Sequence, residues 1–492
     1  MEITFPAVNI DSTVPQLIVA LFAILALLVE VFSRSSRMVF ATCLVGLHIA
    51  LLRSLMQWGR GIPYESSLLA VDGYTTFFNV LFILIAMITL AISLSYVENT
   101  RVDGGKYYPL VLFATLGMML LVSSMDLLMM FLSLELLSIS MYMLVGSQRD
   151  KWVSTEAAIK YILTGAFASG FLLFGIALVY GATGTISFSK MESILGGLTG
   201  GVPPMLQIGI ALMMVGLGFK IAMVPFHMWA PDVYEGAPTP ITGLLSTGSK
   251  IAVVALILRL FSNPFIQVSS QWVGILWVLA VLSMTLGNVA ALLQKNVKRM
   301  LAYSSIAHVG YLLVAFITLS TRGMEAILLY SAFYAVMGLA AFGCIASLTR
   351  AGGSTTAGEG ERLKAEDYTS LGYTQPVQAA ILSICLLSLA GIPLTAGFIG
   401  KLYLFGAAVN AGFVGLAVIA VLNSAVSLYY YLGLMLRMYA LPGRFAPAEE
   451  PVGSLFGKLV LLVLGVTIIA LGIYPTPLIG AVKGAVTALS AL

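Results

Sequence analysis

The sequence predicts an all-α polytopic membrane protein with about 14 transmembrane helices, including two inverted five-helix repeats and two discontinuous helices. Of the 492 residues, 60% are hydrophobic and only 9% are charged, whereas about 25% of the residues in a soluble domain are charged. Apolar runs recur along the chain, and most can supply the roughly 20-residue helix that crosses a bilayer core. Two of these runs contain helix-breaking residues near their centres.

The spans are bounded by charged residues, Gly/Pro clusters or polar loops. The sequence starts without a basic segment or a small-residue cleavage site, so the first apolar run is expected to be retained as a span. The predicted spans lie near residues 14–33, 38–57, 74–97, 107–122, 125–146, 155–180, 205–229, 239–262, 272–294, 299–319, 325–349, 377–408, 411–439 and 456–476.

Basic residues gather in alternate loops between these spans. One side of the membrane carries Arg34, Arg37, Lys298 and Arg299 among others, whereas the other side carries few lysines or arginines. Because cytoplasmic loops are enriched in Lys and Arg, both termini are expected to lie outside. The Gly-, Ser- and Thr-rich stretch between residues 350 and 376 is expected to be a flexible cytoplasmic loop.

The seventh and twelfth spans are predicted to be discontinuous. The seventh contains Pro225 within GLGFKIAMVPFHMWAPDVYEGAPTP, and the twelfth contains Gly391 and Pro393 within LLSLAGIPLTAGFIGKLYLF. A proline inside a span frees backbone groups that protein or water must satisfy, so broken spans tend to line cavities. The two spans are five apart and run in opposite directions, which is typical of inverted repeats. The predicted divisions are residues 1–104 (helices 1–3), 105–265 (first repeat), 266–440 (second repeat) and 441–492 (helix 14).

Four charged residues lie well inside apolar spans: Glu135, Lys220, Lys250 and Lys401. A charge at the centre of a membrane helix costs about 2.5–3.5 kcal/mol on insertion scales, so a functional or structural reason is needed for each. Buried ion pairs would explain one acid and one lysine and would leave two lysines without an acidic partner. Because burial disfavours a charged amine, the pattern indicates a proton relay in which Glu135 influences Lys220.

Three further residues are weaker candidates for the same relay. Lys160 lies about one turn inside its span and either extends to the interface or passes protons in from the cytoplasm. His227 follows the break after Pro225, and His308 lies in YSSIAHVGYLL. Each histidine either extends a chain of water molecules or is a hydrogen-bonded packing residue.

Other polar residues are predicted to have structural roles. Asp232 and Glu235 are expected to cap or shape the loop that leads to the eighth span. Arg259 is close to a helix end and is expected at the membrane interface, and the tyrosines at positions 429–431 resemble an interfacial aromatic belt.

Composition and motifs argue against several other functions. The three cysteines lie far apart, and no phosphate-binding loop or dinucleotide fingerprint begins a helix. The formal net charge of +4 is too small a bias to indicate nucleic acid binding. Redox chemistry and nucleotide hydrolysis are therefore expected outside this chain.

Stretches from about residue 105 to 435 resemble the antiporter-like membrane subunits of complex I, the proton-pumping NADH-quinone oxidoreductase. The similar stretches are LSLELLSI, GLGFKIAMVPFHMWAPDVYEGAPTP, STGSKIA, NVKRMLAYSSIAHVGYLLVA and LSLAGIPLTAGFIGKLY. Among these subunits, the M type typically has glutamate where this chain has Lys401, and it has an HAEAP-like loop where this chain reads VYEGAP. The N type is therefore the most similar. The absence of residues for a long C-terminal extension argues against the L type.

The resemblance implies roles for matching positions and for partner chains. Glu135 and Lys220 would form the gating pair, Lys250 the central relay and Lys401 the terminal site near the outer exit. The chain would lie in a bacterial inner membrane beside other complex I membrane subunits and a peripheral arm, with no cofactor of its own. NADH, FMN, iron–sulfur clusters and quinone would bind to the partners. Alternatives are a subunit of a multi-subunit cation/proton antiporter, a stand-alone solute transporter and a structural scaffold.

Overall fold

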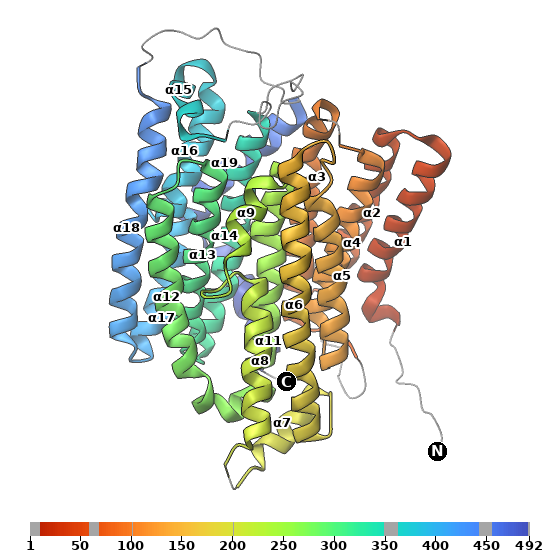
Figure 1. Cartoon of the computed structure of the whole chain (residues 1–492), viewed down its shortest axis with the longest axis vertical. Coiled ribbons are helices and arrows are strands. Elements are labelled where there is room, and N and C mark those ends of the chain that lie inside the picture. The colour runs from red at the N-terminus through yellow and green to blue at the C-terminus, as the bar shows by residue number, and fades with distance from the viewer. Residues whose placement is uncertain are drawn as a thin grey trace.

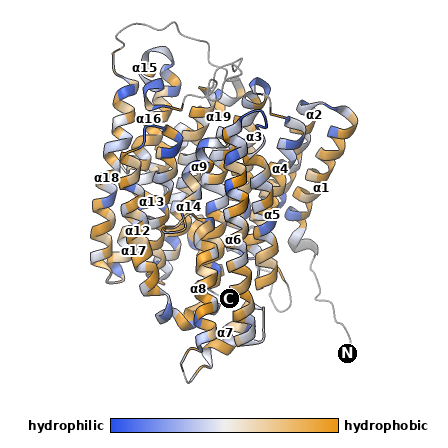
Figure 2. Ribbon diagram, in the orientation of Figure 1, coloured by the Kyte–Doolittle hydropathy of each residue, from blue (hydrophilic) through white to orange (hydrophobic). Residues whose placement is uncertain are grey.

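The computed structural model describes residues 10–58, 68–100, 102–199, 201–348, 363–441 and 455–490. In these ranges the chain folds into long helices that run roughly along one direction and pack side by side (Figure 1). Hydrophobic residues cover most of the length of the helices (Figure 2). This arrangement confirms the all-α class and the multi-pass membrane character that the composition predicts.

The described residues form twenty α-helices together with one π-helix and two 3-10 helices. The helices as far as the middle of the chain are α1 (Ile10–Ser33), α2 (Ser36–Gln57), α3 (Gly73–Asn99), α4 (Gly104–Ser123), α5 (Leu127–Val145), α6 (Trp152–Thr183), α7 (Phe188–Gly196), α8 (Pro204–Lys220), α9 (Trp229–Gly236), α10 (Thr239–Leu244), the π-helix η1 (Leu245–Ser249), α11 (Lys250–Ser262) and η2 (Pro264–Gln271). The remaining helices are α12 (Val273–Leu292), α13 (Val297–Phe316), α14 (Thr321–Ser347), η3 (Ala365–Tyr368), α15 (Leu371–Thr374), α16 (Pro376–Ala390), α17 (Ala396–Asn410), α18 (Val414–Met438), α19 (Leu455–Ile473) and α20 (Thr476–Ser490).

Twelve helical segments among the described residues are long and apolar enough to cross a membrane. They overlap twelve of the fourteen predicted spans. The predicted span near 205–229 contains α8 and the start of α9, and the one near 377–408 contains α16 and α17. The sequence analysis missed α20, a 15-residue helix that is too short to span a bilayer and packs against α3 and α14.

Short polar side chains determine where several helices begin. Asp72, Asp103, Asp126, Asn296 and Ser320 precede α3, α4, α5, α13 and α14, and each accepts a hydrogen bond from a backbone N–H in the first turn. The first N–H groups of a helix have no partner within the helix, so these caps stabilise the starts of the spans. Three of the caps are aspartates, which also favour the positive end of the helix dipole.

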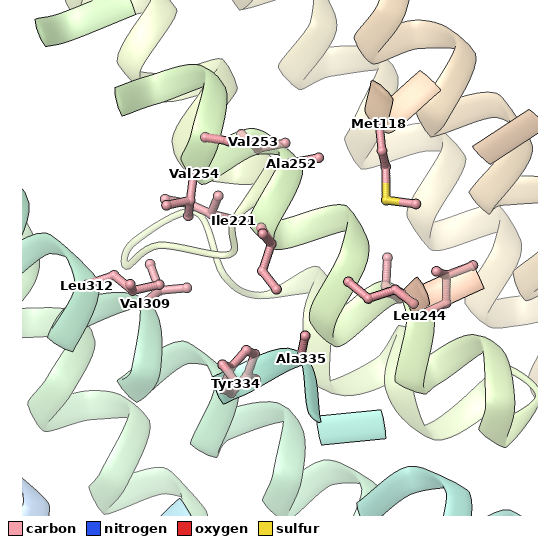
Figure 3. Packing of buried hydrophobic residues seen from close by; sticks show 14 of the residues in the cluster. Met118, Ile221, Leu244, Ala252, Val253, Val254, Val309, Leu312, Tyr334 and Ala335 are labelled. Carbon is pink, nitrogen blue, oxygen red and sulfur yellow. The ribbon is translucent and has the colours of Figure 1, made fainter. Parts of the chain in front are cut away.

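The centre of the molecule is formed by α14 and by the continuous stretch of α10, η1 and α11, which are the most deeply buried spans. In Figure 3, Val253 and Val254 of α11, Val309 of α13, and Tyr334 and Ala335 of α14 pack in one apolar cluster. The spans nearest the two ends of the chain are the least buried. Side chains on α11, α13 and α14 are therefore shielded from the surroundings by outer helices.

Candidate functional site

Lys220, Lys250 and Lys401 are all buried, with 6%, 3% and 5% of their surface exposed. Each lies at or beside an irregularity in a helix. Lys220 is the last residue of α8, Lys250 directly follows the π-helix η1, and Lys401 lies in α17 just after the segment between α16 and α17. Such irregularities release backbone groups inside the protein and are common at functional sites.

Lys220 is held by α5. Its Nζ donates hydrogen bonds to the hydroxyls of Ser138, at 2.7 Å, and Tyr142, at 3.2 Å. The same Nζ lies 5.6 Å from the centre of the Tyr142 ring, within the range of a cation–π interaction. All of these partners are uncharged, so they orient the amine without neutralising it.

Glu135 lies one turn before Ser138 on α5 and is half-buried. Its carboxylate accepts a 2.5 Å hydrogen bond from Ser169 of α6. The ion pairs of the described residues include none between Glu135 and Lys220, although their charges are close enough to interact. The pairing of these two residues therefore stays a prediction.

Lys250 connects the two halves of the chain. Its Nζ donates a 2.7 Å hydrogen bond to Ser305 of α13 and lies 5.4 Å from the centre of the Tyr234 ring on α9. Ser305 in turn contacts the Tyr234 hydroxyl at 3.3 Å. His227, between α8 and α9, is 5% exposed, lies within electrostatic range of Lys250, and its Nδ1 has no hydrogen-bond partner among the described residues.

His308 lies in a cluster of hydroxyl groups on α13, α14 and α18. Its Nδ1 is hydrogen-bonded to the Tyr330 hydroxyl, and its Nε2 lies 3.1 Å from the Tyr431 hydroxyl. The Tyr431 hydroxyl is also hydrogen-bonded to Ser304, the neighbour of the residue that binds Lys250. The predicted interfacial belt is wrong for Tyr431 and for Tyr430, which are buried.

Lys401 binds the end of the preceding helix. Its Nζ donates to the carbonyls of Leu389 and Ala390, the last two residues of α16, and to the Ser424 hydroxyl, each at 2.9 Å. The C-terminal carbonyls of a helix lack helical partners and carry its negative end, so they favour a cation. The ring of Tyr311 lies 5.1 Å from the same Nζ and 5.5 Å from the His308 ring, which links the two groups.

One face of α13 therefore supplies much of the connection between Lys250 and Lys401. Ser304, His308 and Tyr311 have the i, i+4, i+7 spacing that places side chains on one face of a helix. This spacing was available in the sequence as a signal for Ser304 and Tyr311, which the sequence analysis missed. Tyr330 and Tyr431 were missed because only the fold brings α14 and α18 to His308.

Lys160 lies outside this buried series. Its side chain is 45% exposed and forms ion pairs with Glu156, at 2.9 Å, and with Asp232, at 2.8 Å. Arg299 of α13 pairs with Asp232, at 2.6 Å, and with Glu235, at 2.9 Å. The two acids thus hold α9 between α6 and α13, in addition to the loop-shaping role that the sequence suggests.

Arg259 lies near a helix end, in the last turn of α11, as the sequence analysis expects, but it faces the interior of the protein. Its side chain is fully buried and pairs with Asp72 at 2.9 Å, with a further 2.9 Å hydrogen bond to Thr75. The guanidinium lies 5.0 Å from the centre of the Tyr74 ring. Burial of a charge requires such compensation, and the pair fastens α11 to α3.

Cofactor ligands are not grouped in the part of the chain that the structure describes. No cluster of three or more His, Cys, Asp or Glu side chains there could hold a metal ion. The three cysteines are free and buried, on α2, α14 and α16.

Comparisons with known proteins agree with this architecture. The family model for the NADH:quinone oxidoreductase/Mrp antiporter transmembrane region matches residues 124–427. NADH-quinone oxidoreductase subunit N of Trichlorobacter lovleyi is 44% identical over 441 residues, which are 89% of each chain. A chain of respiratory complex I from Thermus thermophilus, solved with bound aureothin, superposes with a TM-score of 0.81 at 35% identity and covers 96% of this chain and 99% of that one.

A chain of the Mrp complex from Dietzia sp. has the same fold, with a TM-score of 0.84, 98% coverage of both chains and 21% identity. The fold is thus shared by complexes with different names, whereas the high identity over most of the chain occurs with subunit N proteins. The chain therefore belongs to the NADH:quinone oxidoreductase/Mrp antiporter membrane family, in its group of NADH-quinone oxidoreductase N subunits.

Proposed function

We propose that this chain is the proton-translocating membrane subunit of a respiratory NADH-quinone oxidoreductase, with Glu135, Lys220, Lys250 and Lys401 as its proton-carrying groups. The observation that carries the assignment of residues is the set of three lysines buried without a carboxylate partner among the described residues. Keeping such groups in a membrane protein is costly, and they typically mark ion or proton pathways.

The contacts of the lysines suit proton transfer. Serine and tyrosine hydroxyls both donate and accept hydrogen bonds, and the two nitrogens of a neutral imidazole do the same as a pair. From Lys250 the chain of groups runs through Ser305 and its neighbour Ser304 to Tyr431 and His308. The ring of Tyr311 then separates His308 from Lys401. Transfer across the remaining gaps needs water or side-chain rotation.

Glu135 and Lys220 act at the start of this path. The half-buried carboxylate and the buried amine lie on neighbouring helices, and Ser138 links the two positions along α5. Moving a charge toward or away from Glu135 would change the balance between charged and neutral Lys220. That change would then propagate to Lys250, with His227 and Lys160 as auxiliary groups on the uptake side.

The helix order supports two inverted repeats. Residues 105–265 contain α4, α5, α6, the divided pair α8 and α9, and the continuous stretch from α10 to α11. Residues 266–440 contain α12, α13, α14, the divided pair α16 and α17, and α18. The fourth member is interrupted in both sets, which favours two discontinuous membrane helices in equivalent positions. The flanking divisions are residues 1–104 and 441–492.

Orientation and partners complete the proposal. Both termini face outward, and the protons move from the cytoplasm to the outside of a bacterial inner membrane. Other membrane subunits and a peripheral arm that binds NADH, FMN, iron–sulfur clusters and quinone drive the movement. The relatives named as subunits of NADH-quinone oxidoreductase support this assignment, and its electron carriers are expected in those partners.

The test is to replace Lys250 by Met in the complete complex and to measure proton movement per NADH oxidised in inverted membrane vesicles. Lys190→Met, a change at an exposed lysine on α7, is the matched control. We expect the Lys250 variant to assemble and to lose most of its proton movement, whereas the control keeps it. An unchanged proton-to-electron ratio in the Lys250 variant would refute the relay.

The family also contains Mrp antiporter subunits, so a cation/proton antiporter is the second candidate. It predicts a complex without NADH oxidation that exchanges sodium for protons in vesicles. Co-purification of the chain with a flavin-containing, NADH-oxidising arm would exclude this candidate.

A further inference from the structure

Lys220 and Lys250 each lie beside a buried tyrosine, and a space separates the two tyrosines. Lys220 donates a hydrogen bond to the Tyr142 hydroxyl on α5. Lys250 donates to Ser305, which contacts the Tyr234 hydroxyl on α9 at 3.3 Å. No hydrogen bond between described residues joins these two sets of contacts. A proton that passes from Lys220 to Lys250 therefore has to cross the space between Tyr142 and Tyr234.

Helix α6 lies beside both tyrosines. It packs against α5, against α8, which ends at Lys220, and against α9. Ser169 of α6 donates to Glu135 of α5. Tyr161 and Gly165 precede Ser169 by eight and four residues, so these three positions share one face of the helix. The face of α6 that contacts Glu135 therefore also carries Tyr161.

The ring of Tyr161 lies against Tyr142. The two ring centres are 4.6 Å apart, and the rings are almost perpendicular, at 89°. A Cβ at Gly165 would collide with the Tyr142 hydroxyl, so this hydroxyl lies directly over the glycine, one turn along α6 from Tyr161. The hydroxyl that binds Lys220 is thus brought to the same face of α6 as Tyr161.

Tyr161 also contacts the helix that carries Tyr234. Its ring stacks on Trp229 of α9, with the ring centres 4.6 Å apart and the planes inclined by 11°. Trp229 lies five residues before Tyr234 on this short helix. Tyr161 is within electrostatic range of Tyr142 and of Tyr234. One side chain therefore lies near the tyrosine of each lysine.

The hydroxyl of Tyr161 is not used in packing the helices. The side chain is only 2% exposed, and its hydroxyl forms no hydrogen bond with any described residue. Buried polar groups nearly always have a partner, and a buried water molecule commonly supplies it. A hydroxyl can donate one hydrogen bond and accept others, so with water beside it Tyr161 can take up a proton and release another.

We propose that Tyr161 carries protons from Lys220 to Lys250, an inference that rests on the proton-translocating function proposed above. The ammonium group of Lys220 gives a proton to the Tyr142 hydroxyl, which releases its own proton to a water molecule bound at Tyr161. Tyr161 passes a proton toward Tyr234 in the same way. The neutral amine of Lys250 takes up the last proton of the series. Each hydroxyl gains one proton and loses another, so only the two lysines change charge.

The experiment replaces Tyr161 by Phe in the whole complex. Phenylalanine keeps the ring contacts with Tyr142 and Trp229 and removes only the hydroxyl. NADH oxidation and proton uptake are measured in inverted membrane vesicles that contain equal amounts of assembled complex. A positioned side chain typically accelerates proton transfer by about 10²- to 10⁴-fold, so even with partial replacement by water we expect both rates to fall at least about fivefold. The solvent deuterium isotope effect on NADH oxidation should rise, because proton transfer at the altered position becomes rate-limiting.

Two comparisons separate the hydroxyl from the ring. Tyr180→Phe changes a tyrosine of the same helix that is 52% exposed, and it should keep wild-type rates. Tyr161→Leu removes the ring as well as the hydroxyl. If only Tyr161→Leu were impaired and Tyr161→Phe matched the wild type in rate and isotope effect, Tyr161 would be a packing residue and the inference would be overturned.

The Lys250→Met variant distinguishes a failure of this inference from a failure of the proposed function. Normal pumping in Tyr161→Phe beside lost pumping in Lys250→Met would overturn the route through Tyr161 alone. Normal pumping in both variants would overturn the proposed function and the route with it. If Tyr161→Phe did not assemble, Tyr142→Phe would replace it, and wild-type rates in that variant would equally overturn the route.

Discussion

Replacing Tyr431 by Phe tests the chain of hydroxyl groups between Lys250 and His308. Tyr431 is fully buried, and its hydroxyl is hydrogen-bonded to Ser304 and to His308. Phenylalanine keeps the ring and its packing and removes only the oxygen atom. The change leaves His308 Nε2 without its partner, and an unsatisfied buried polar group costs about 1–3 kcal/mol.

If the barrier to proton transfer rises by the same amount, that step slows about 5- to 160-fold. The assay is NADH oxidation and proton uptake measured together in inverted membrane vesicles that contain equal amounts of assembled complex. Because electron transfer is coupled to pumping, we expect both rates to fall at least fivefold in Tyr431→Phe. We use the lower end of the range of about 5- to 160-fold because a water molecule at the position of the missing hydroxyl would carry part of the proton transfer.

Tyr429→Phe is the matched control. Tyr429 lies on the same helix but is 77% exposed, and its hydroxyl forms no hydrogen bond with any described residue. The control should therefore retain wild-type rates. If Tyr431→Phe pumped as fast as the control, with the same number of protons per NADH, the path through Tyr431 would be refuted.

Three further variants test the packing around the site. A Cβ at Gly397 would collide with the backbone of α16, whereas a Cβ at Gly406 meets nothing within 4 Å. Gly397→Ala should therefore lower the free energy of unfolding by about 1–3 kcal/mol, whereas Gly406→Ala should leave it almost unchanged. Thermal unfolding of the purified complex measures both. Asp72→Asn leaves the buried Arg259 charge uncompensated, so we expect the protein to lose about 3–5 kcal/mol of stability. The measurement is the yield of assembled complex, which should fall; a normal yield would contradict the prediction. Arg299→Gln removes two partly exposed ion pairs worth up to about 1 kcal/mol each, so added salt should lower the unfolding temperature of the wild type more than that of the variant.

Most of the fold could be predicted from the sequence because the bilayer restricts the solutions. A run of about 20 apolar residues has few alternatives to a membrane helix, so twelve spans were found close to their positions in the structure. The two discontinuous membrane helices, around Pro225 and around Gly391 with Pro393, stay a prediction. The helix α20 was missed because its 15 residues fall below the length that identifies a span.

Of the candidate site, only the charged positions could be predicted from the sequence. Lys220, Lys250 and Lys401 stand out because a charge in an apolar run is rare. Their partners are serines, tyrosines and carbonyl groups, which are common in membrane helices and carry no such signal. The pairing of Arg259 was missed for a related reason, since its partner Asp72 lies 187 residues earlier in the chain and only the packing of α11 against α3 joins them.

Arg259 and the three buried lysines differ in how the structure compensates their charges, and this difference supports the role proposed for the lysines. Arg259 is buried against a carboxylate that accepts two hydrogen bonds from it, so its charge is permanently compensated. Arginine also keeps its proton under all ordinary conditions. The lysines are equally buried, yet they donate only to hydroxyl and carbonyl oxygens. Those acceptors stabilise an ammonium group without fixing its charge. A small shift in the surrounding potential can therefore change the protonation of a lysine at these positions, whereas the same shift leaves the arginine pair intact.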